Sequence, residues 1–228
     1  MMSLPTAFGL ALRQLGDPAI LRVLAKSLLV TLVIFVLLGS LVLTGLYHWL
    51  VSLGSAWSAE LSALAALLLT AIAGWLLFRF VALFVLQFFA EDVVRAVEAK
   101  HYPMEASAAR SLPFREEFAN GLRAAGRALG LNLLALPFAL VLLFTGVGTA
   151  LLFWAVNAFL LGRELQDMVW LRHRQDRGEL APMGGSRRFL LGGAIAGLLM
   201  LPFVNLLAPV IGAASATHLV HRGRAANA

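Results

Sequence analysis

Two long stretches of the chain contain almost no charged residue. Residues 27–47 read SLLVTLVIFVLLGSLVLTGLY, and residues 61–90 form a second apolar run in which Arg79 is the only charged residue. About 18 consecutive apolar residues suffice to suggest a membrane-spanning helix, and a soluble fold of this size could not hide two such runs. We therefore predict an all-α integral membrane protein with a single membrane domain over residues 1–228.

The composition supports this class and narrows the function. Hydrophobic residues make up 61% of the 228 residues and charged residues 13%, with a mean hydropathy of +0.86, whereas a soluble domain carries about 25% charged residues. The absence of cysteine excludes disulfides and thiolate chemistry. No phosphate-binding loop, zinc-protease motif or nucleotide fingerprint is present. We expect neither an enzyme nor a bound cofactor, and we attribute the net charge of +6 to inside-positive loops rather than to nucleic-acid binding.

The two apolar runs predict two long transmembrane helices. The run 27–47 is about 21 residues or roughly 31 Å long, enough for a bilayer core. The run 61–90 is about 30 residues or roughly 45 Å long, so it must tilt or bend. Residues 1–26 are predicted to form an interfacial N-terminus, because Leu4, Phe8, Leu12 and Leu15 recur at helical spacing.

Two further apolar segments, 129–161 and 189–220, are predicted to form short helical hairpins. Each arm has about 12 to 16 residues, or roughly 18 to 24 Å of helix, which is shorter than the roughly 30 Å of a full crossing. Half-depth insertion and a full crossing with a very tight turn both remain open. In the second hairpin, Pro202 is expected to end one arm and Asn205 to cap the next.

The remaining segments are polar. Residues 91–128 predict solvated or interfacial helices that are broken near Pro103 and Pro113. Residues 162–188 predict a cytoplasmic helix and loop, and residues 221–228 form the tail. Within the polar helix, Arg163 and Asp167 are four residues apart and are expected to pair.

The distribution of cations predicts the topology. Of the 18 Lys and Arg residues, all except Arg79 lie in four segments: 1–26, 91–128, 162–188 and 218–228. The positive-inside rule places all four in the cytoplasm, so both termini are cytoplasmic and only the loop 48–60 lies outside. Irregular backbone at the hairpin tips must be covered by protein or water, which predicts a bundle or a homo-oligomer.

One helix start has the features of an anion site. Asp17 is a plausible N-cap and Pro18 a plausible first residue, so residues 19–22 would form a first turn with free N–H groups, to which Arg22 adds a charge. The alternative, which the frequency of flanking arginines favours, is that Asp17 only caps the helix and Arg22 only anchors it to lipid phosphates. Arg79 is likewise either an anion contact or, as its depth favours, an interface marker.

The order of these segments resembles a known family. The resemblance is carried by DPAILRVLAKSLL before the first span, GVGTALLFWAVNAFLLGRELQDM leading out of the first hairpin, and LPFVNLLAPVIGAASATHL near the end. Together they resemble the CysZ-like sulfate permeases, which are grouped with the etoposide-induced membrane proteins of the endoplasmic reticulum. The resemblance implies passage of a small oxyanion, typically sulfate, and a bacterial inner-membrane location.

The resemblance also implies substrate-binding residues. In that family a Gly-Leu-Arg-Arg element ahead of the first span contacts the anion, and the matching positions here are Ala19, Ile20, Leu21 and Arg22, of which Arg22 retains the family residue. With Arg79, these residues form the predicted substrate-binding set.

No metal site is predicted, because His218 and His221 are three residues apart but no third ligand is evident. The predicted function is thus an oxyanion permease without nucleotide hydrolysis, whose partners are the lipid bilayer, sulfate and further copies of the chain. A non-conducting membrane scaffold of the same family is the alternative.

Overall fold

The computed structural model describes residues 2–52, 59–176, 178–202 and 204–225, apart from the side chains of residues 59, 75–80 and 82–88. Every regular element in these ranges is a helix, which confirms the predicted all-α class. In chain order the elements are α1 (Leu4–Gln14), α2 (Pro18–Ser52), α3 (Ala59–Phe88), α4 (Ala90–His101), α5 (Pro103–Ala108), α6 (Phe114–Leu142), the 3-10 turn η1 (Leu143–Thr145), α7 (Gly148–Trp170), α8 (Gly185–Met200), the 3-10 turn η2 (Val204–Leu206) and α9 (Ala208–Ala225).

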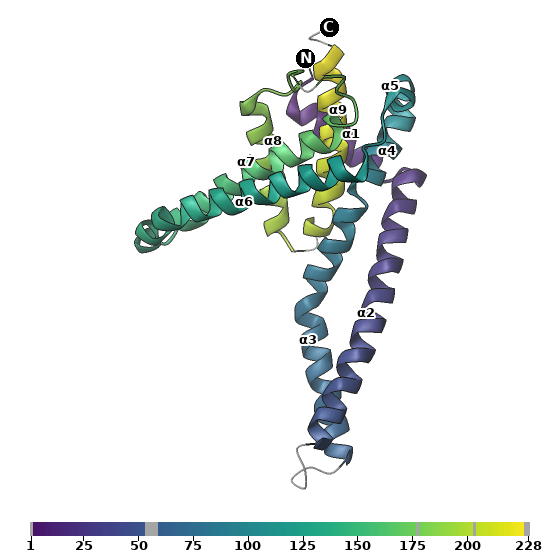
Figure 1. Cartoon of the computed structure of the whole chain (residues 1–228), viewed down its shortest axis with the longest axis vertical. Coiled ribbons are helices and arrows are strands. Elements are labelled where there is room, and N and C mark those ends of the chain that lie inside the picture. Colours follow the sequence, from purple (N-terminus) through teal and green to yellow (C-terminus); the bar gives the residue numbers. More distant parts are fainter. Residues whose placement is uncertain (1, 53–58, 177, 203, 226–228) are drawn as a thin grey trace. The chain divides into compact units, whose positions relative to one another are not determined.

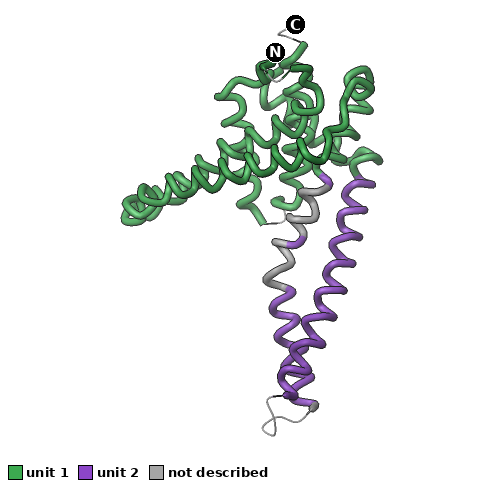
Figure 2. The backbone as a smooth tube through the Cα atoms, in the orientation of Figure 1, with its two compact units in different colours: residues 1–20, 90–228 green, residues 21–89 purple. Residues whose placement is uncertain are grey.

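The chain divides into two compact units, which Figure 2 draws in different colours. Unit 1 comprises residues 1–20 and 90–228, and unit 2 comprises residues 21–89.

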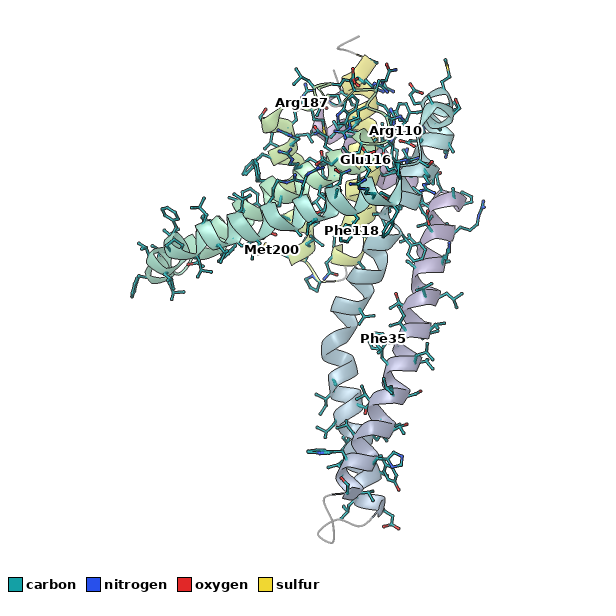
Figure 3. All side chains as sticks on the ribbon, viewed as in Figure 1. Phe35, Arg110, Glu116, Phe118, Arg187 and Met200 are labelled. Atoms are coloured by element: carbon teal, nitrogen blue, oxygen red, sulfur yellow. The ribbon has the colours of Figure 1, made fainter. Side chains whose placement is uncertain are left out.

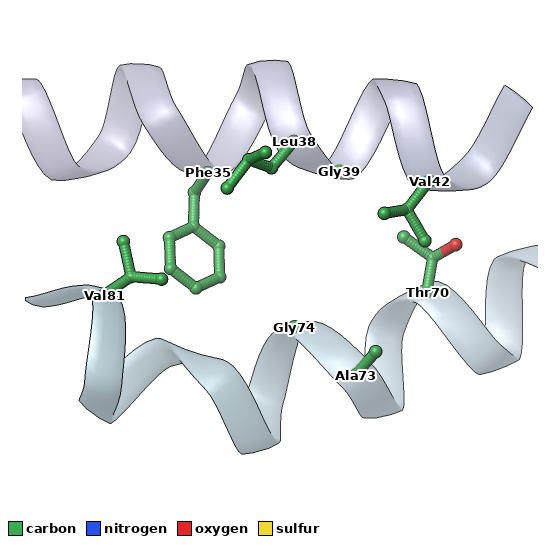
Figure 4. A pocket seen from close by; sticks show the side chains of 8 residues that line it. All are labelled: Phe35, Leu38, Gly39, Val42, Thr70, Ala73, Gly74 and Val81. Carbon is green, nitrogen blue, oxygen red and sulfur yellow. The ribbon is translucent and has the colours of Figure 1, made fainter. Parts of the chain in front are cut away.

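Unit 2 consists of α2 and α3, which run antiparallel to each other (Figure 1). Helix α2 begins at Pro18, where a missing N–H costs little, and continues for 35 residues. The two helices enclose a small apolar cavity of about 70 Å³ near Phe35 and Gly74 (Figure 4). A Cβ atom on Gly74 would lie 3.8 Å from the Phe35 ring, which is an ordinary van der Waals contact.

Unit 1 is built around α9. Nearly every residue of α9 from Ala208 to His221 is buried, because α1, α4, α7 and α8 all pack against it. The stretch GAASAT in the middle of this helix offers small side chains, which allow neighbouring helices to approach closely. The C-terminal arm of the second predicted hairpin is therefore the core of unit 1.

Helices α6 and α7 form a long hairpin within unit 1 (Figure 1). The sequence predicted a polar segment ending at residue 128 and a separate apolar arm after it. Helix α6 instead crosses this boundary without a break and has 29 residues in all. The change from polar to apolar side chains alters what the helix faces without interrupting its backbone hydrogen bonds. At the tip, Gly146 adopts a φ of 71°, a conformation that glycine accepts without steric cost.

The helix breaks predicted at prolines are present in the structure, but the cap predicted at Asn205 is not. Helix α5 begins at Pro103 and α6 directly after Pro113, so both predicted breaks are confirmed. Helix α8 ends at Met200, just before Pro202, as expected. Asn205 is not the N-cap of α9, because it lies in η2, three residues before that helix begins. Its side chain is buried instead.

Two helices in the described part of the chain are long and apolar enough to cross a membrane: Pro18–Ser52 and Phe114–Thr145. A core helix of a soluble protein would bury most of its surface, but only 6% and 11% of the most apolar window of each is buried. Leu28, Leu41 and Leu133 are more than half exposed. Such surfaces need lipid or protein around them, which supports an all-α membrane protein.

Candidate functional site

A polar cavity of about 260 Å³ lies within unit 1. The described residues that line it come from α6, α7, the segment after α7, and α8: Asn120, Arg123, Arg127, Arg163, Gln166, Asp167, Trp170, Leu171, Arg174, Glu179, Ala181 and Arg188. Five of these are arginines, and we call this site the arginine cavity. Its volume is several times the roughly 30 Å³ that one water molecule occupies in the liquid, so it can hold a small ion together with water.

Helical periodicity brings the lining residues to the cavity. Arg123 and Arg127 are one turn apart on α6. On α7, Arg163, Gln166, Asp167 and Trp170 occupy positions i, i+3, i+4 and i+7, which share one face of a helix. The hairpin turns both faces toward the same space, and α8 adds Arg188 from its first turn.

The cavity retains an excess of positive charge. Asp167 Oδ2 lies 3.7 Å from both Arg127 Nη2 and Arg163 Nε, too far for a strong hydrogen bond to either. Glu179 is the second carboxylate of the lining. Five guanidinium groups against two carboxylates leave three positive charges uncompensated within the described lining.

One cavity arginine is held by a carboxylate just outside the lining. Arg174 Nη2 lies 3.2 Å from Glu116 Oε1, and Arg110 Nη2 lies 3.0 Å from the same oxygen. Figure 3 marks Arg110 and Glu116 side by side. Because Glu116 is shared between two guanidinium groups, it fixes the position of Arg174 and neutralises it only in part.

Several polar atoms of the lining are buried and lack a hydrogen-bond partner among the described residues. They include the donors Asn120 Nδ2 and Arg163 Nε, and the acceptor Gln166 Oε1. Gln166 as a whole is only 1% exposed. Buried polar groups are nearly always paired with protein, water or an ion, so these two donors and one acceptor indicate that the cavity accommodates water or a small polar ion.

A comparison with protein families identifies the family of the chain. Residues 7–209 match the family described as sulfate transporter CysZ/etoposide-induced protein 2.4. The chain belongs to this family. The match covers most of the chain and confirms the resemblance noted in the sequence. Searches of curated proteins and of solved structures found no match. Membership makes the chain a membrane protein of a transporter-type family.

The residues that match the family's anion-contacting element lie at the start of α2. The helix begins at Pro18, so Ala19, Ile20, Leu21 and Arg22 form its first turn, as predicted. Ile20 is buried, whereas Leu21 and Arg22 are exposed. None of these residues is part of the described lining of the arginine cavity. The side chain of Arg79 lies outside the described residues, so its role stays a prediction.

Sequence reasoning missed the arginine cavity. It predicted that Arg163 and Asp167 pair, which the 3.7 Å separation confirms, but it took the pair as part of a solvated helix face. The available signal was the pair Arg123 and Arg127, one turn apart on the preceding helix. The arginines of α6 and Arg163 of α7 are about equally far from the hairpin turn along the chain. Antiparallel helices place such positions at the same level.

Unit 1 contains a second polar centre that is fully buried. The Nε2 atoms of His173 and His221 lie 2.8 and 3.2 Å from Glu98 Oε1, and Arg172 Nη1 lies 3.3 Å from Glu98 Oε2. Burial by itself raises the pKa of Glu98, but hydrogen bonds from the two histidines and the charge of Arg172 outweigh it and lower the pKa to about 2. The carboxylate is therefore ionised at neutral pH.

The two histidines of α9 do not act as a pair. His218 bonds through Nδ1 to the Tyr102 hydroxyl at 2.8 Å and through Nε2 to the Gln14 amide at 2.9 Å. His221 instead joins His173 and Glu98. The expected pair of His218 and His221 is thus replaced by a group of three, in which Glu98 and His173 join His221 from 123 and 48 positions away along the chain.

Proposed function

We propose that the chain passes a small oxyanion, sulfate foremost, across the membrane without nucleotide hydrolysis, and that the arginine cavity binds this ion. The observation that carries the proposal is the convergence of five arginines on one cavity, in which two buried donors make no hydrogen bond to any described residue. Membership of a family described by sulfate transport supports the choice of ion.

The chemistry of the cavity suits a tetrahedral dianion. Guanidinium groups donate pairs of parallel hydrogen bonds to oxyanions and remain charged at every physiological pH. The lining carries three more positive than negative charges, which attracts the dianion, and Glu116 outside the lining offsets part of this excess. Because Asp167 competes for Arg127 and Arg163, the ion binds by displacing a carboxylate that is held only at 3.7 Å.

We also propose that Arg22 is a contact of the moving ion, at the first turn of α2. A helix N-terminus favours negative charge by about 0.3 to 1 kcal/mol, and Arg22 is exposed there. Asp17 would oppose an anion, but its carboxylate lies 2.7 Å from Lys100 Nζ, which offsets its charge. Ala19, Ile20 and Leu21 contribute only backbone N–H groups to this contact.

We further propose a multi-pass protein of the bacterial inner membrane with both termini in the cytoplasm. The one-sided distribution of cations supports this orientation, and it assigns the arginine cavity to the cytoplasmic side. The tip of the α6–α7 hairpin supports a homo-oligomer, because Phe144 is 94% exposed beside irregular backbone. Such backbone is stable in a membrane only when protein or a water-filled cavity covers it.

The direct test is uptake of radiolabelled sulfate into liposomes that contain the purified protein. We expect saturable uptake by the wild type and about a tenfold loss in Arg163→Ala, because a hydrogen bond to a charged group contributes on the order of 1.5 kcal/mol at the low end, which suits this partly exposed side chain. Arg115→Ala is the matched control, since Arg115 is an exposed arginine of α6 outside the cavity lining. Equal uptake by both variants would remove the cavity from the pathway.

The same assay separates the permease from a non-conducting scaffold. A scaffold predicts that wild-type liposomes take up sulfate, selenate, thiosulfate and phosphate no faster than protein-free liposomes. Uptake of selenate, thiosulfate or phosphate but not of sulfate would support the permease hypothesis with a different substrate.

A further inference from the structure

Three side chains far apart in the sequence meet in the buried polar centre of unit 1. Glu98 comes from α4, His173 from the turn after α7, and His221 from α9. Each offers one ligand atom, and these atoms lie within 4.8 Å of one another. The side chains of all three are 1% exposed. The convergence is specific, since both imidazoles direct Nε2 at the same carboxylate oxygen, Oε1 of Glu98.

This donor set matches a transition-metal dication. Two imidazoles and one carboxylate are common ligands of Zn²⁺, with bonds of about 2.0 to 2.2 Å. In a tetrahedral site, ligand atoms at these bond lengths lie roughly 3.3 Å apart. The two Nε2 to Oε1 separations are 2.8 and 3.2 Å, so the carboxylate must shift by only a few tenths of an ångström. All three ligand atoms lie within 4.8 Å of one another, and the imidazoles are free to close on an ion by small ring rotations. A hard cation such as Mg²⁺ is disfavoured, because it prefers oxygen ligands and retains its water.

Neighbouring groups hold the three ligands in orientation. Arg172 Nη1 lies 3.3 Å from the second oxygen of Glu98, which leaves Oε1 to face the histidines. The Tyr102 ring stacks on His221 with centroids 4.6 Å apart. Tyr102 is itself fixed by its hydrogen bond to His218. Supporting contacts of this kind orient metal ligands and contribute to affinity.

Hydrogen bonds among these groups do not complete the cluster. His221 Nδ1 is buried and has no hydrogen-bond partner among the described residues. A metal on Nε2 leaves the ring proton on Nδ1, so a buried water molecule is the expected partner of Nδ1. A metal ion would also balance the charge of the Glu98 carboxylate by direct coordination.

We propose that Glu98, His173 and His221 form a binding site for a transition-metal dication, with Zn²⁺ the best match, and that the ion fastens α4, α9 and the turn after α7 together. The site is distinct from the arginine cavity, but one of its ligands is the sequence neighbour of a cavity residue. His173 precedes Arg174, which lines that cavity, so the metal fixes the turn that presents an anion-binding arginine.

The proposal is tested on the full-length protein carrying a streptavidin-binding tag, because a polyhistidine tag would bind metal itself. Protein is purified in detergent without chelators, its metal content is measured by mass spectrometry, and stripped protein is titrated with Zn²⁺ while thermal unfolding is followed. We expect about one zinc ion per chain and a rise in the unfolding midpoint when zinc is restored.

Substitution by glutamine distinguishes metal binding from hydrogen bonding. A glutamine amide can still donate to Glu98 but is a poor zinc ligand. We therefore expect His173→Gln and His221→Gln to fold, to lose bound zinc and to lose the zinc-dependent shift. His48→Ala removes an exposed histidine of unit 2 and should retain both.

A measurement on the wild type covers the case in which the variants fail to fold. Co²⁺ added to stripped protein should produce the visible absorption of a four-coordinate site, and Zn²⁺ should abolish it. Absence of this absorption, together with no zinc-dependent shift, would overturn the proposal. Retention of zinc by the folded glutamine variants at the wild-type level would overturn it equally.

Discussion

Gly162 of α7 lies directly against the backbone carbonyl of Arg188 in α8, and a Cβ atom at position 162 would overlap that carbonyl. One turn further along α8, Gly192 meets the carbonyl of Ala158 in the same way. The two glycines allow α7 and α8 to pack with their backbones in contact. Arg163 directly follows Gly162, so this contact also sets where Arg163 and Arg188 enter the arginine cavity.

Gly162→Ala should destabilise unit 1. The added methyl group meets backbone rather than a flexible side chain, so the helices must separate, at a cost of about 1 to 3 kcal/mol in the free energy of unfolding. The midpoint of thermal unfolding in detergent should fall. Gly197→Ala is the control, because a Cβ atom at this α8 position meets nothing within 4 Å and alanine favours helix. Equal midpoints for Gly162→Ala and the wild type would contradict the close packing.

Much of the fold follows from local patterns. Uninterrupted apolar runs predicted α2 and α3, and Pro103, Pro113 and Pro202 marked where helices begin or end. Helix α6 was divided wrongly, because a change in polarity along a helix resembles a boundary when only composition is read. The core position of α9 was not evident either. Its small residues suit both a lipid-facing arm and a tightly packed centre, and only the neighbouring helices decide between them.

The sites were less predictable than the fold. The arginine cavity joins α6, α7 and α8, and no single helix contains enough cations to distinguish it from a solvated face. Glu98 lies in a polar helix where helical spacing of charges suggests exposure, yet the side chain is buried. Its partners His173 and His221 are 75 and 123 residues away. Contacts at such separations depend on tertiary packing and leave no local pattern.

Asp167→Asn should strengthen sulfate binding. Asp167 competes with the anion for Arg127 and Arg163 at 3.7 Å, and both arginines are partly exposed, so its contribution is on the order of 1 kcal/mol or less. We expect half-maximal uptake at an about three- to fivefold lower sulfate concentration. Asp176→Asn removes an exposed carboxylate outside the cavity lining and should leave the concentration dependence unchanged. An increase in the half-maximal concentration in Asp167→Asn would mean that Asp167 supports the site rather than competing with the ion.

Arg22 should affect flux if it contacts the anion. Lysine keeps the charge but loses the planar fork, so Arg22→Lys should reduce uptake partly and Arg22→Ala severely. A lipid anchor predicts a nearly silent lysine variant, and an alanine variant with a lower yield of inserted protein. Sulfate uptake normalised to inserted protein separates the two roles. Unchanged normalised uptake in Arg22→Ala would remove this helix start from the pathway.

Single cysteines should report the topology, since the chain has none of its own. We expect Ser52→Cys, at the end of α2 and within the predicted external loop 48–60, to react with a membrane-impermeant maleimide added outside intact cells. Gln175→Cys, in the exposed segment after α7, should react only after the membrane is opened, because the positive-inside rule places residues 162–188 in the cytoplasm.

The same labelling measures how far the α6–α7 hairpin extends. Helix α6 and its 3-10 extension form a 32-residue helical segment, Phe114–Thr145, whose apolar part is long enough to cross a membrane, whereas the sequence predicted an arm of about 12 to 16 residues. A cysteine at Phe144 in the exposed tip should stay unlabelled from outside if the hairpin stops within the bilayer, and should react efficiently if it reaches the far surface. External labelling at Gln175 would reject the whole topology, because an odd number of crossings would then separate the polar segments that carry the arginine cavity.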